Sequence, residues 1–192
     1  MTDLTRDPII NAVHKGIKRG IRVAVDNKCY SSAVVLILSG IDTMAYIGMP
    51  ENQEDVTKND FIAWVNRYIQ FPCKEQLTGY DIYGARCGML HSFSPISKLS
   101  REGKCRQVGY MDRSVPEVIF NPKVTKEVVM VSIEALADAF SKGVDRFLID
   151  LYSGVKRAKI ADSRFQYIVQ MYPYEKEQCQ PPSSADAPTA RG

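Results

Sequence analysis

The spacing of apolar residues along the chain predicts a mainly helical protein. Residues 9–27 and 132–151 carry an apolar residue every three or four positions, which is typical of a helix with one buried face. Residues 31–48 are apolar on nearly every side, so we expect the most buried helix there. Polar caps and prolines place the helix ends. The full set of predicted helices is 9–27, 31–48 (capped by Ser31 or Ser32), 57–71, 78–93, 132–151 and a weaker one at 156–171.

Short β-like runs interrupt this helical pattern once. They lie at 107–112, 118–120 and 127–131 and are separated by Pro116 and Pro122. They predict a small antiparallel β insertion, about residues 107–131, before the last long helix. The predicted fold class is therefore mainly α, a four-helix up-and-down bundle with this insertion.

The length of 192 residues suits one domain, which we place at 1–177. Residues 178–192 are rich in Pro, Ser and Ala and are predicted to be a disordered tail. The apolar run 33–41 is about half the length needed to span a bilayer, and the first residues do not read as a signal peptide. Five cysteines, an odd number with no C-x-x-C pair, fit reduced thiols. We expect a cytoplasmic protein without a membrane partner.

The charge total says little, but the distribution of charge is informative. Lys and Arg number 25 against 22 Asp and Glu, a net charge of +3 that is too small to indicate nucleic-acid binding. One basic loop nevertheless collects four cations within nine residues, and these are candidate contacts for an RNA backbone: Lys98, Arg101, Lys104 and Arg106. A second basic stripe, of Lys15, Lys18 and Arg22, is expected to be a solvated helix face rather than an RNA contact.

Common catalytic motifs are missing from the sequence. It has no phosphate-binding G-x-x-x-x-G-K-[ST] loop, no G-x-G-x-x-G, no H-E-x-x-H and no G-x-S-x-G. Only two histidines, His14 and His91, are present, and no two cysteines have chelating spacing. We therefore expect no metal and no cofactor.

The informative segment is Arg86-Cys-Gly-Met-Leu-His91, on a predicted helix directly before the basic loop. It resembles the motif of the HEPN domains (higher eukaryotes and prokaryotes nucleotide-binding), many of which carry an Arg, four to six residues and a His on the third core helix of a four-helix bundle. The resemblance in organisation covers about residues 9–152. Cys87 departs from the pattern, because active members often have a polar residue directly after the arginine.

The resemblance implies a metal-independent endoribonuclease, often a toxin or defence effector, that forms a homodimer with a shared cleft. A partner protein that restrains it is also possible in such systems. RNA carries its own nucleophile, the 2′-OH, so cleavage needs proton transfer and stabilisation of charge at phosphorus. A histidine serves the first need and an arginine the second. His91 is thus expected to move protons and Arg86 to hold the phosphate, which leans the assignment toward an enzyme.

Two alternatives remain beside the ribonuclease. An inactive HEPN-like module would bind a nucleotide or a protein, and Cys87 favours this over full activity. In an unrelated helical scaffold, Arg86 and His91 would merely form a surface pair. Tyr80 and Tyr83, on the same predicted helix, are either stacking platforms for bases or half-buried packing residues.

Helix geometry adds further expectations about the pair. Five residues correspond to about 140° of rotation and about 7.5 Å of rise, so Arg86 and His91 should point in different directions. A second copy of the helix would then supply the partner, packed at Gly84 and Gly88, unless these glycines ease packing within one bundle. Asp42, a carboxylate within an apolar helix, is expected to orient Arg86 or His91, or else to meet water at the end of the bundle. With Cys87, it completes the predicted surroundings of the pair.

Overall fold

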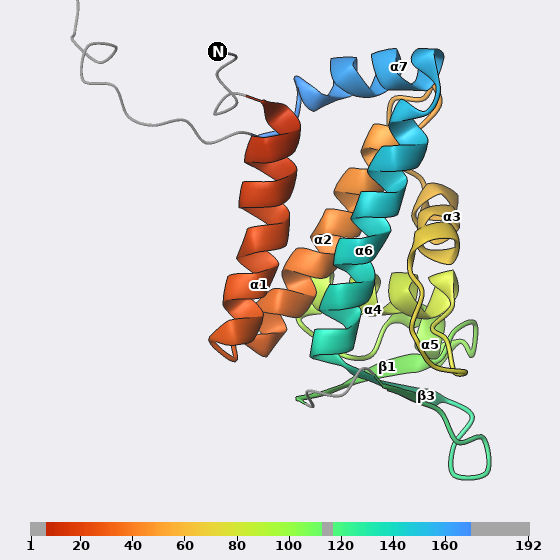
Figure 1. The fold of residues 1–192 in the computed structure, drawn as a ribbon. Helices are drawn as coiled ribbons and strands as arrows, with labels where there is room; N and C mark the ends of the chain where they lie inside the picture. The colour runs from red at the N-terminus through yellow and green to blue at the C-terminus, as the bar shows by residue number, and fades with distance from the viewer. Residues whose placement is uncertain (1–6, 113–116, 170–192) are drawn as a thin grey trace, which may run out of the picture.

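The computed structural model describes residues 7–112 and 117–169, which form a mainly helical fold with a small three-stranded sheet at one end (Figure 1). The predicted mainly helical class is confirmed. The N-terminal helix has a first part wound as a π-helix, η2, which continues directly into α1. The helices are η2 (Ile9–Lys18), α1 (Arg19–Asp26), α2 (Tyr30–Gly48), α3 (Lys58–Tyr68), α4 (Gly79–Ser92), α5 (Lys98–Arg101), α6 (Ile133–Tyr152) and α7 (Val155–Phe165). The predicted tail at 178–192 lies outside the described residues.

Helix α2 is the centre of the fold, as its apolar composition predicts. It packs against α1, α3, α4, α6 and α7, and its side chains Ile37, Ile41 and Met44 are fully buried. Among the described residues, it is the one helix long and apolar enough to cross a membrane by length and composition, although the apolar run 33–41 alone is too short. The core helix of a folded domain has the same composition, and half of the apolar window of α2 is buried against its neighbours.

Polar side chains fix where several helices begin. Thr57 and Thr78 each accept a hydrogen bond from the backbone N–H three residues on, and the aspartates at those positions, Asp60 and Asp81, bond back to the threonine N–H groups. Ser132 caps α6 in the same way through one bond. Helix α2 has no such cap. The prediction that Ser31 or Ser32 caps α2 is wrong because the helix begins at Tyr30, so both serines already lie within its first turn.

The small sheet has mixed direction. β3 (Val128–Ser132) lies in the middle, parallel to β1 (Gln107–Met111) and antiparallel to β2 (Val118–Ile119). The predicted antiparallel insertion is therefore wrong for the β1–β3 pair. The chain reverses direction before β2 and again after it, so β3 runs in the direction of β1. Val129 and Val131 of β3 are fully buried, which closes one end of the helical layer.

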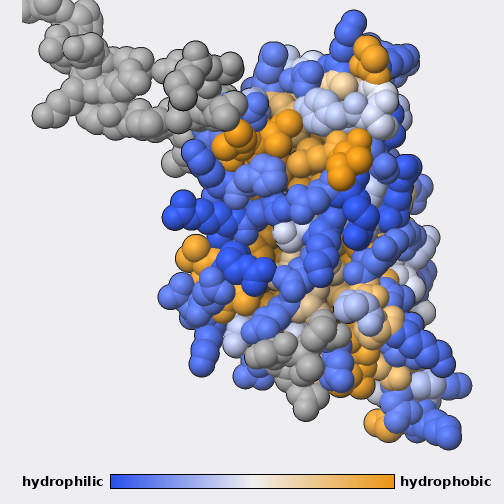
Figure 2. All heavy atoms as spheres, viewed as in Figure 1, coloured by the Kyte–Doolittle hydropathy of each residue, from blue (hydrophilic) through white to orange (hydrophobic). Residues whose placement is uncertain are grey.

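Ion pairs join the N-terminal helices to α6. Lys18 Nζ lies 2.7 Å from Asp145 Oδ1, and an Arg22 Nη atom lies 2.8 Å from Asp138 Oδ1. Two of the three cations of the basic stripe, Lys18 and Arg22, thus face the acids of α6, while Lys15 is exposed. Figure 2 shows the face viewed in Figure 1, on which hydrophilic residues dominate the middle, while hydrophobic patches lie toward the α7 end, at the left edge and toward the sheet.

Helix α7 packs against α2 and contacts its C-terminal end through Arg164. The buried guanidinium of Arg164 donates to the backbone carbonyl oxygens of Ile47, in the last turn of α2, and of Met49 and Pro50, directly after α2 ends. Carbonyl groups at a helix C-terminus lack intrahelical donors. Arg164 therefore supplies part of what the end of α2 needs.

Candidate active site

Arg86 of α4 lies between Asp42 of α2 and His91 at the last turn of α4. Arg86 Nε donates to Asp42 Oδ2 at 2.9 Å, and an Arg86 Nη atom lies 3.1 Å from His91 Nε2. The side chains of Arg86 and Asp42 are 25% and 28% exposed, and His91 is exposed. A cation, a carboxylate and an imidazole therefore meet at a site that solvent reaches.

The contact between Arg86 and His91 within one chain differs from the helix-geometry expectation. The Cα positions do diverge around α4, but the long arginine side chain spans the difference and its guanidinium reaches the imidazole. The prediction that the two residues point apart is therefore wrong at the level of their functional groups. Both groups of the motif come together without a second copy of the helix.

The electrostatics of the cluster follow from partial burial. Burial raises the pKa of Asp42, and the hydrogen bond and positive charge of Arg86 offset only part of this effect. Burial lowers the pKa of Arg86, but the hydrogen bond and the charge of Asp42 outweigh burial, so the pKa lies above its ordinary value. Arg86 is thus a permanent donor, so Nε2 of His91 is the acceptor in their contact. We assign the neutral tautomer of His91 with its proton on Nδ1.

This arrangement has a defined chemical capacity. The single Nε2 lone pair of His91 accepts from Arg86 in this structure, and it can accept a proton once that contact opens, while the Nη atoms of Arg86 present donors to an anion at the same place. Asp42 holds Nε, on the other side of the guanidinium. A phosphate that enters between the Nη atoms and Nε2 would find both a base and a cation.

Tyr83 and Cys87 lie next to this cluster on α4. Burial raises the pKa of Tyr83, and the neighbouring Cys87 thiol raises it further. The Tyr83 ring packs edge-on against Phe61, with ring centroids 5.4 Å apart. The half-buried packing interpretation therefore fits Tyr83, whereas Tyr80, one turn earlier, is exposed.

Gly84 and Gly88 are covered by the segment that follows α4. A Cβ atom on Gly84 would lie 2.5 Å from Cys105 Sγ, and one on Gly88 would collide with the Ser94 carbonyl oxygen. These glycines permit close packing within one chain. The described structure gives them a partner without a second copy of α4.

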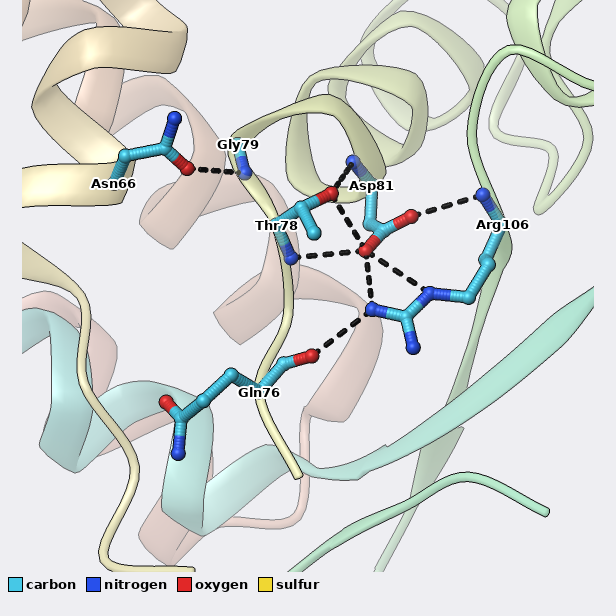
Figure 3. A network of polar contacts seen from close by, with 6 residues as sticks. All are labelled: Asn66, Gln76, Thr78, Gly79, Asp81 and Arg106. Carbon is cyan, nitrogen blue, oxygen red and sulfur yellow. Dashed lines mark hydrogen bonds and ion pairs between the residues drawn. The ribbon is translucent and has the colours of Figure 1, made fainter. Parts of the chain in front are cut away.

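Arg106, one of the four predicted RNA contacts, lies in a structural network at the start of α4 (Figure 3). Its guanidinium lies 2.6 Å from Asp81 Oδ2 and donates to the Gln76 carbonyl oxygen at 2.9 Å, while its backbone N–H donates to Asp81 Oδ1. Burial alone would raise the pKa of Asp81, but the hydrogen bonds from Arg106 and Thr78 outweigh it and lower that pKa. The structure thus gives Arg106 a stabilising role that its place in a basic loop did not indicate. The Thr78-x-x-Asp81 capping pattern was the available signal for half of this network.

The remaining cations of the basic loop differ in their partners. Lys104 Nζ lies 2.7 Å from Glu102, and Lys98 Nζ lies 3.8 Å from the same carboxylate. The side chain of Arg101 has no hydrogen bond or ion pair to any residue in the described part of the chain. Arg101, Lys104 and Arg106 line one cleft of about 690 Å³, whereas Lys98 lies outside its lining. The sequence did not indicate that Lys126, twenty residues further along the chain, lines the same cleft.

A second, more apolar groove borders the cluster on the α2 side. It has a volume of about 810 Å³ and lies between η2, α2 and residues 167–169. Asp42 and Ser39 contribute polar atoms to its lining, while Ile17 and Leu36 make apolar walls. Sequence analysis missed this groove, because its walls come from segments that are far apart in the chain.

Within residues 7–112 and 117–169, no group of three His, Cys, Asp or Glu side chains is placed to hold a metal ion. Comparison with family models, curated proteins and solved structures found no match for this chain.

Proposed function

We propose that the protein is a metal-independent endoribonuclease of the HEPN-like type, with Arg86 and His91 as its catalytic residues. The observation that carries this proposal is the 3.1 Å contact between an Arg86 Nη atom and His91 Nε2 at a solvent-reached site. Proton transfer and charge stabilisation are the two requirements of RNA cleavage by its own 2′-OH, and this pair offers both.

The proposed reaction balances without a cofactor. His91 Nε2 takes the proton of the 2′-OH while the 2′-oxygen forms a bond to the adjacent phosphorus. The bond from phosphorus to the 5′-oxygen breaks, and that oxygen receives a proton, from the imidazolium of His91 or from water. Arg86 donates to the non-bridging oxygens, where charge accumulates. The products are a 2′,3′-cyclic phosphate and a 5′-hydroxyl.

Asp42 acts in this proposal as a positioning residue. It accepts from Arg86 Nε at 2.9 Å, which holds the guanidinium with its Nη atoms toward His91. The planar fork of an arginine then has a fixed orientation before RNA binds. Cys87 and Tyr83 surround the pair without a direct part in the chemistry.

The wider assignment rests on the same motif. Under the HEPN-like hypothesis, α1, α2, α4 and α6 correspond to the four-helix bundle, with the Arg-x4-His motif on its third helix. The same hypothesis implies a homodimer, an RNA substrate, a toxin or defence role and an inhibitory partner protein. The contacts of α2 with α1, α4 and α6 support a central place for α2 in such a bundle.

One observation favours a second candidate, an inactive HEPN-like module that binds a nucleotide or a protein. Arg86 already has two partners, Asp42 and His91, and Cys87 follows it where active members often have a polar residue. In that case the cluster would bind a phosphate without cleaving the chain.

The two candidates are separated by RNA cleavage in EDTA. Purified wild type should release fragments that end in a 2′,3′-cyclic phosphate, and His91→Ala should cut on the order of a hundredfold or more slowly. Arg86→Ala should show a comparable loss. His14→Ala and Arg22→Ala are matched controls, because His14 is the other histidine and Arg22, like Arg86, is paired with an aspartate. Intact RNA with wild type, or equal cleavage by His91→Ala, would refute the ribonuclease.

A further inference from the structure

The cleft at the start of α4 has an excess of positive charge. Four cations line it, Arg101, Lys104, Arg106 and Lys126, against two carboxylates, Asp81 and Glu127. The pair of Arg106 and Asp81 neutralises itself, as the 2.6 Å contact shows. Lys104 is likewise paired, with Glu102 at 2.7 Å, so Arg101 and Lys126 remain as unpaired cations of the lining, against the carboxylate of Glu127.

Two of these cationic side chains have no partner among the described residues. The side chains of Arg101 and Lys126 are exposed and make no ion pair or hydrogen bond with any residue that the structure describes. Lys104 contacts Glu102, but its side chain is 61% exposed and remains accessible. Arg101 and Lys104 come from the end of α5 and the loop after it, and Lys126 comes from the turn before β3. These two segments converge on one cleft of about 690 Å³. Two unpaired cations and one exposed lysine that converge in this way suit the phosphates of a nucleic acid.

An aromatic ring borders the same cleft. Tyr80 is 44% exposed, and Lys58 Nζ lies 4.6 Å from its ring centroid. A base can stack on the exposed part of this ring. A cationic groove with an exposed aromatic ring is the combination that binds single-stranded nucleic acid with little sequence preference.

Helix α4 connects this cleft with the Arg86–His91 pair. Tyr80, Tyr83, Cys87 and His91 are spaced so that they follow one side of α4, with Tyr80 and His91 exposed at its two ends. Eleven residues of helix span about 16 Å. That length corresponds to about five stacked nucleotides at about 3.4 Å each.

We propose that this cleft is a binding site for single-stranded RNA, separate from the catalytic pair. Arg101, Lys104 and Lys126 contact successive phosphates, one base stacks on Tyr80, and the strand continues along α4 toward Arg86 and His91. The proposal rests on the proposed function for the direction of the strand, but binding in the cleft itself does not require cleavage.

The test is equilibrium binding of a fluorescein-labelled single-stranded RNA of about 12 nucleotides, within the site sizes of such grooves. All proteins are full-length and carry His91→Ala, so that the RNA stays intact. Arg101→Ala and Lys126→Ala should each weaken binding and reduce the salt dependence of log K by about 0.7 per lost phosphate contact. Tyr80→Ala should weaken binding on the order of tenfold, while Tyr80→Trp retains it.

Lys123→Ala is the matched control for Lys126→Ala. Lys123 is another exposed lysine, three residues earlier and outside the lining of the cleft, and its loss should leave the salt dependence unchanged. All substituted side chains are exposed, and equal thermal unfolding confirms that the variants fold.

Several outcomes would overturn the cleft proposal. The first is unchanged binding by Arg101→Ala, Lys126→Ala and Tyr80→Ala, and the second is an effect of Lys123→Ala as large as that of Lys126→Ala. The third is displacement of RNA by poly-glutamate at the same charge concentration, which would indicate an acidic protein partner. Cleavage is measured separately, with proteins that keep the wild-type His91. If cleft-dependent binding occurs while wild type cuts no RNA, the cleft proposal stands and the ribonuclease fails. If wild type cuts RNA and the cleft variants bind normally, the reverse holds.

Discussion

Asp42 and Asp81 lie on neighbouring helices, and each accepts a hydrogen bond from an arginine, yet their pKa values shift in opposite directions. At Asp42, burial raises the pKa and Arg86 offsets only part of it. At Asp81, which is 2% exposed, Arg106 and Thr78 together outweigh burial and lower the pKa. The first carboxylate is held at an energetic disadvantage beside the candidate catalytic pair. The second stabilises the start of the helix that carries this pair.

We predict that Asp81→Ala destabilises the protein by about 3–5 kcal/mol at neutral pH, because it leaves the Arg106 guanidinium without its buried partner. Asp60→Ala is the matched control, since Asp60 occupies the same capping position in α3 without an arginine, and it should cost about 1 kcal/mol. Because the folded pKa of Asp81 is lowered, its ionised form stabilises the fold above the ordinary value of 3.8, and this contribution is lost as pH falls through the folded pKa. Urea unfolding across pH should thus show the Asp81→Ala difference shrinking in acid. A difference that is constant with pH would contradict this account.

Asp42→Asn should separate activity from stability. The fold raises the pKa of Asp42, so its contribution to the free energy of unfolding falls as pH rises from the ordinary value of 3.8 through the folded pKa, and stays lower above it. The neutral amide removes this penalty, so we expect unchanged or higher stability at pH 7 and no difference in strong acid. Ribonuclease activity should nevertheless fall on the order of tenfold or more, because Arg86 loses its charged anchor. Lower stability at pH 7 would show that Asp42 holds the fold rather than positions Arg86.

At the scale of the elements, Gly40 of α2 lets that helix approach α6 closely. A Cβ atom on Gly40 would lie 2.6 Å from Cζ of the buried Phe140 ring, so we predict that Gly40→Ala destabilises by about 1–3 kcal/mol. Gly20, in α1, is the control. Its Cβ would meet only Leu36 Cδ1, at the ordinary distance of 3.7 Å, so Gly20→Ala should stabilise by about 0.5–1 kcal/mol through helix propensity. Thermal or urea unfolding measures both, and a stabilised Gly40→Ala would show that α2 and α6 can separate without cost.

The elements were predictable wherever a local signal fixes them. Thr57, Thr78 and Ser132 cap the helices that their sequences predict, and the runs near 107, 118 and 128 became the strands. Strand direction was not predictable, because apolar alternation says that a strand has a buried face but not which neighbour it pairs with. The π-type start of the first helix likewise left no recognisable signal in its apolar spacing.

The candidate site was predictable as a motif but not as a geometry. A helical wheel places Cα atoms, and it cannot show that the arginine side chain reaches His91 or that Asp42, 44 residues earlier, accepts its Nε–H. The role of Arg106 was equally hidden, since four cations in one loop look alike until each partner is known. Long-range pairs of this kind depend on how α2, α4 and the sheet pack together.

At the scale of the whole molecule, helix α4 links the parts on which function would depend. Its first turn is fixed by the network of Asp81 and Arg106, its exposed Tyr80 borders the basic cleft, and its last turn carries His91. Central α2 and strand β1 pack against the same helix. A disturbance of the Asp81 network should therefore affect both the stability of the fold and the position of the catalytic pair.

The contact between Arg86 and His91 within one chain leads to a prediction about assembly. If each chain holds a complete site, a mixture of Arg86→Ala and His91→Ala proteins should show no more ribonuclease activity than the two proteins measured separately. A site shared between two copies would behave differently, because half of randomly formed dimers would be mixed and one of their two sites would be intact, giving about one quarter of wild-type activity. The mixture is refolded together to allow exchange, and wild type diluted with His91→Ala serves as the reference. Recovery near one quarter would show that the catalytic arginine and histidine come from different copies, whereas no recovery would place the whole reaction on one face of a single α4.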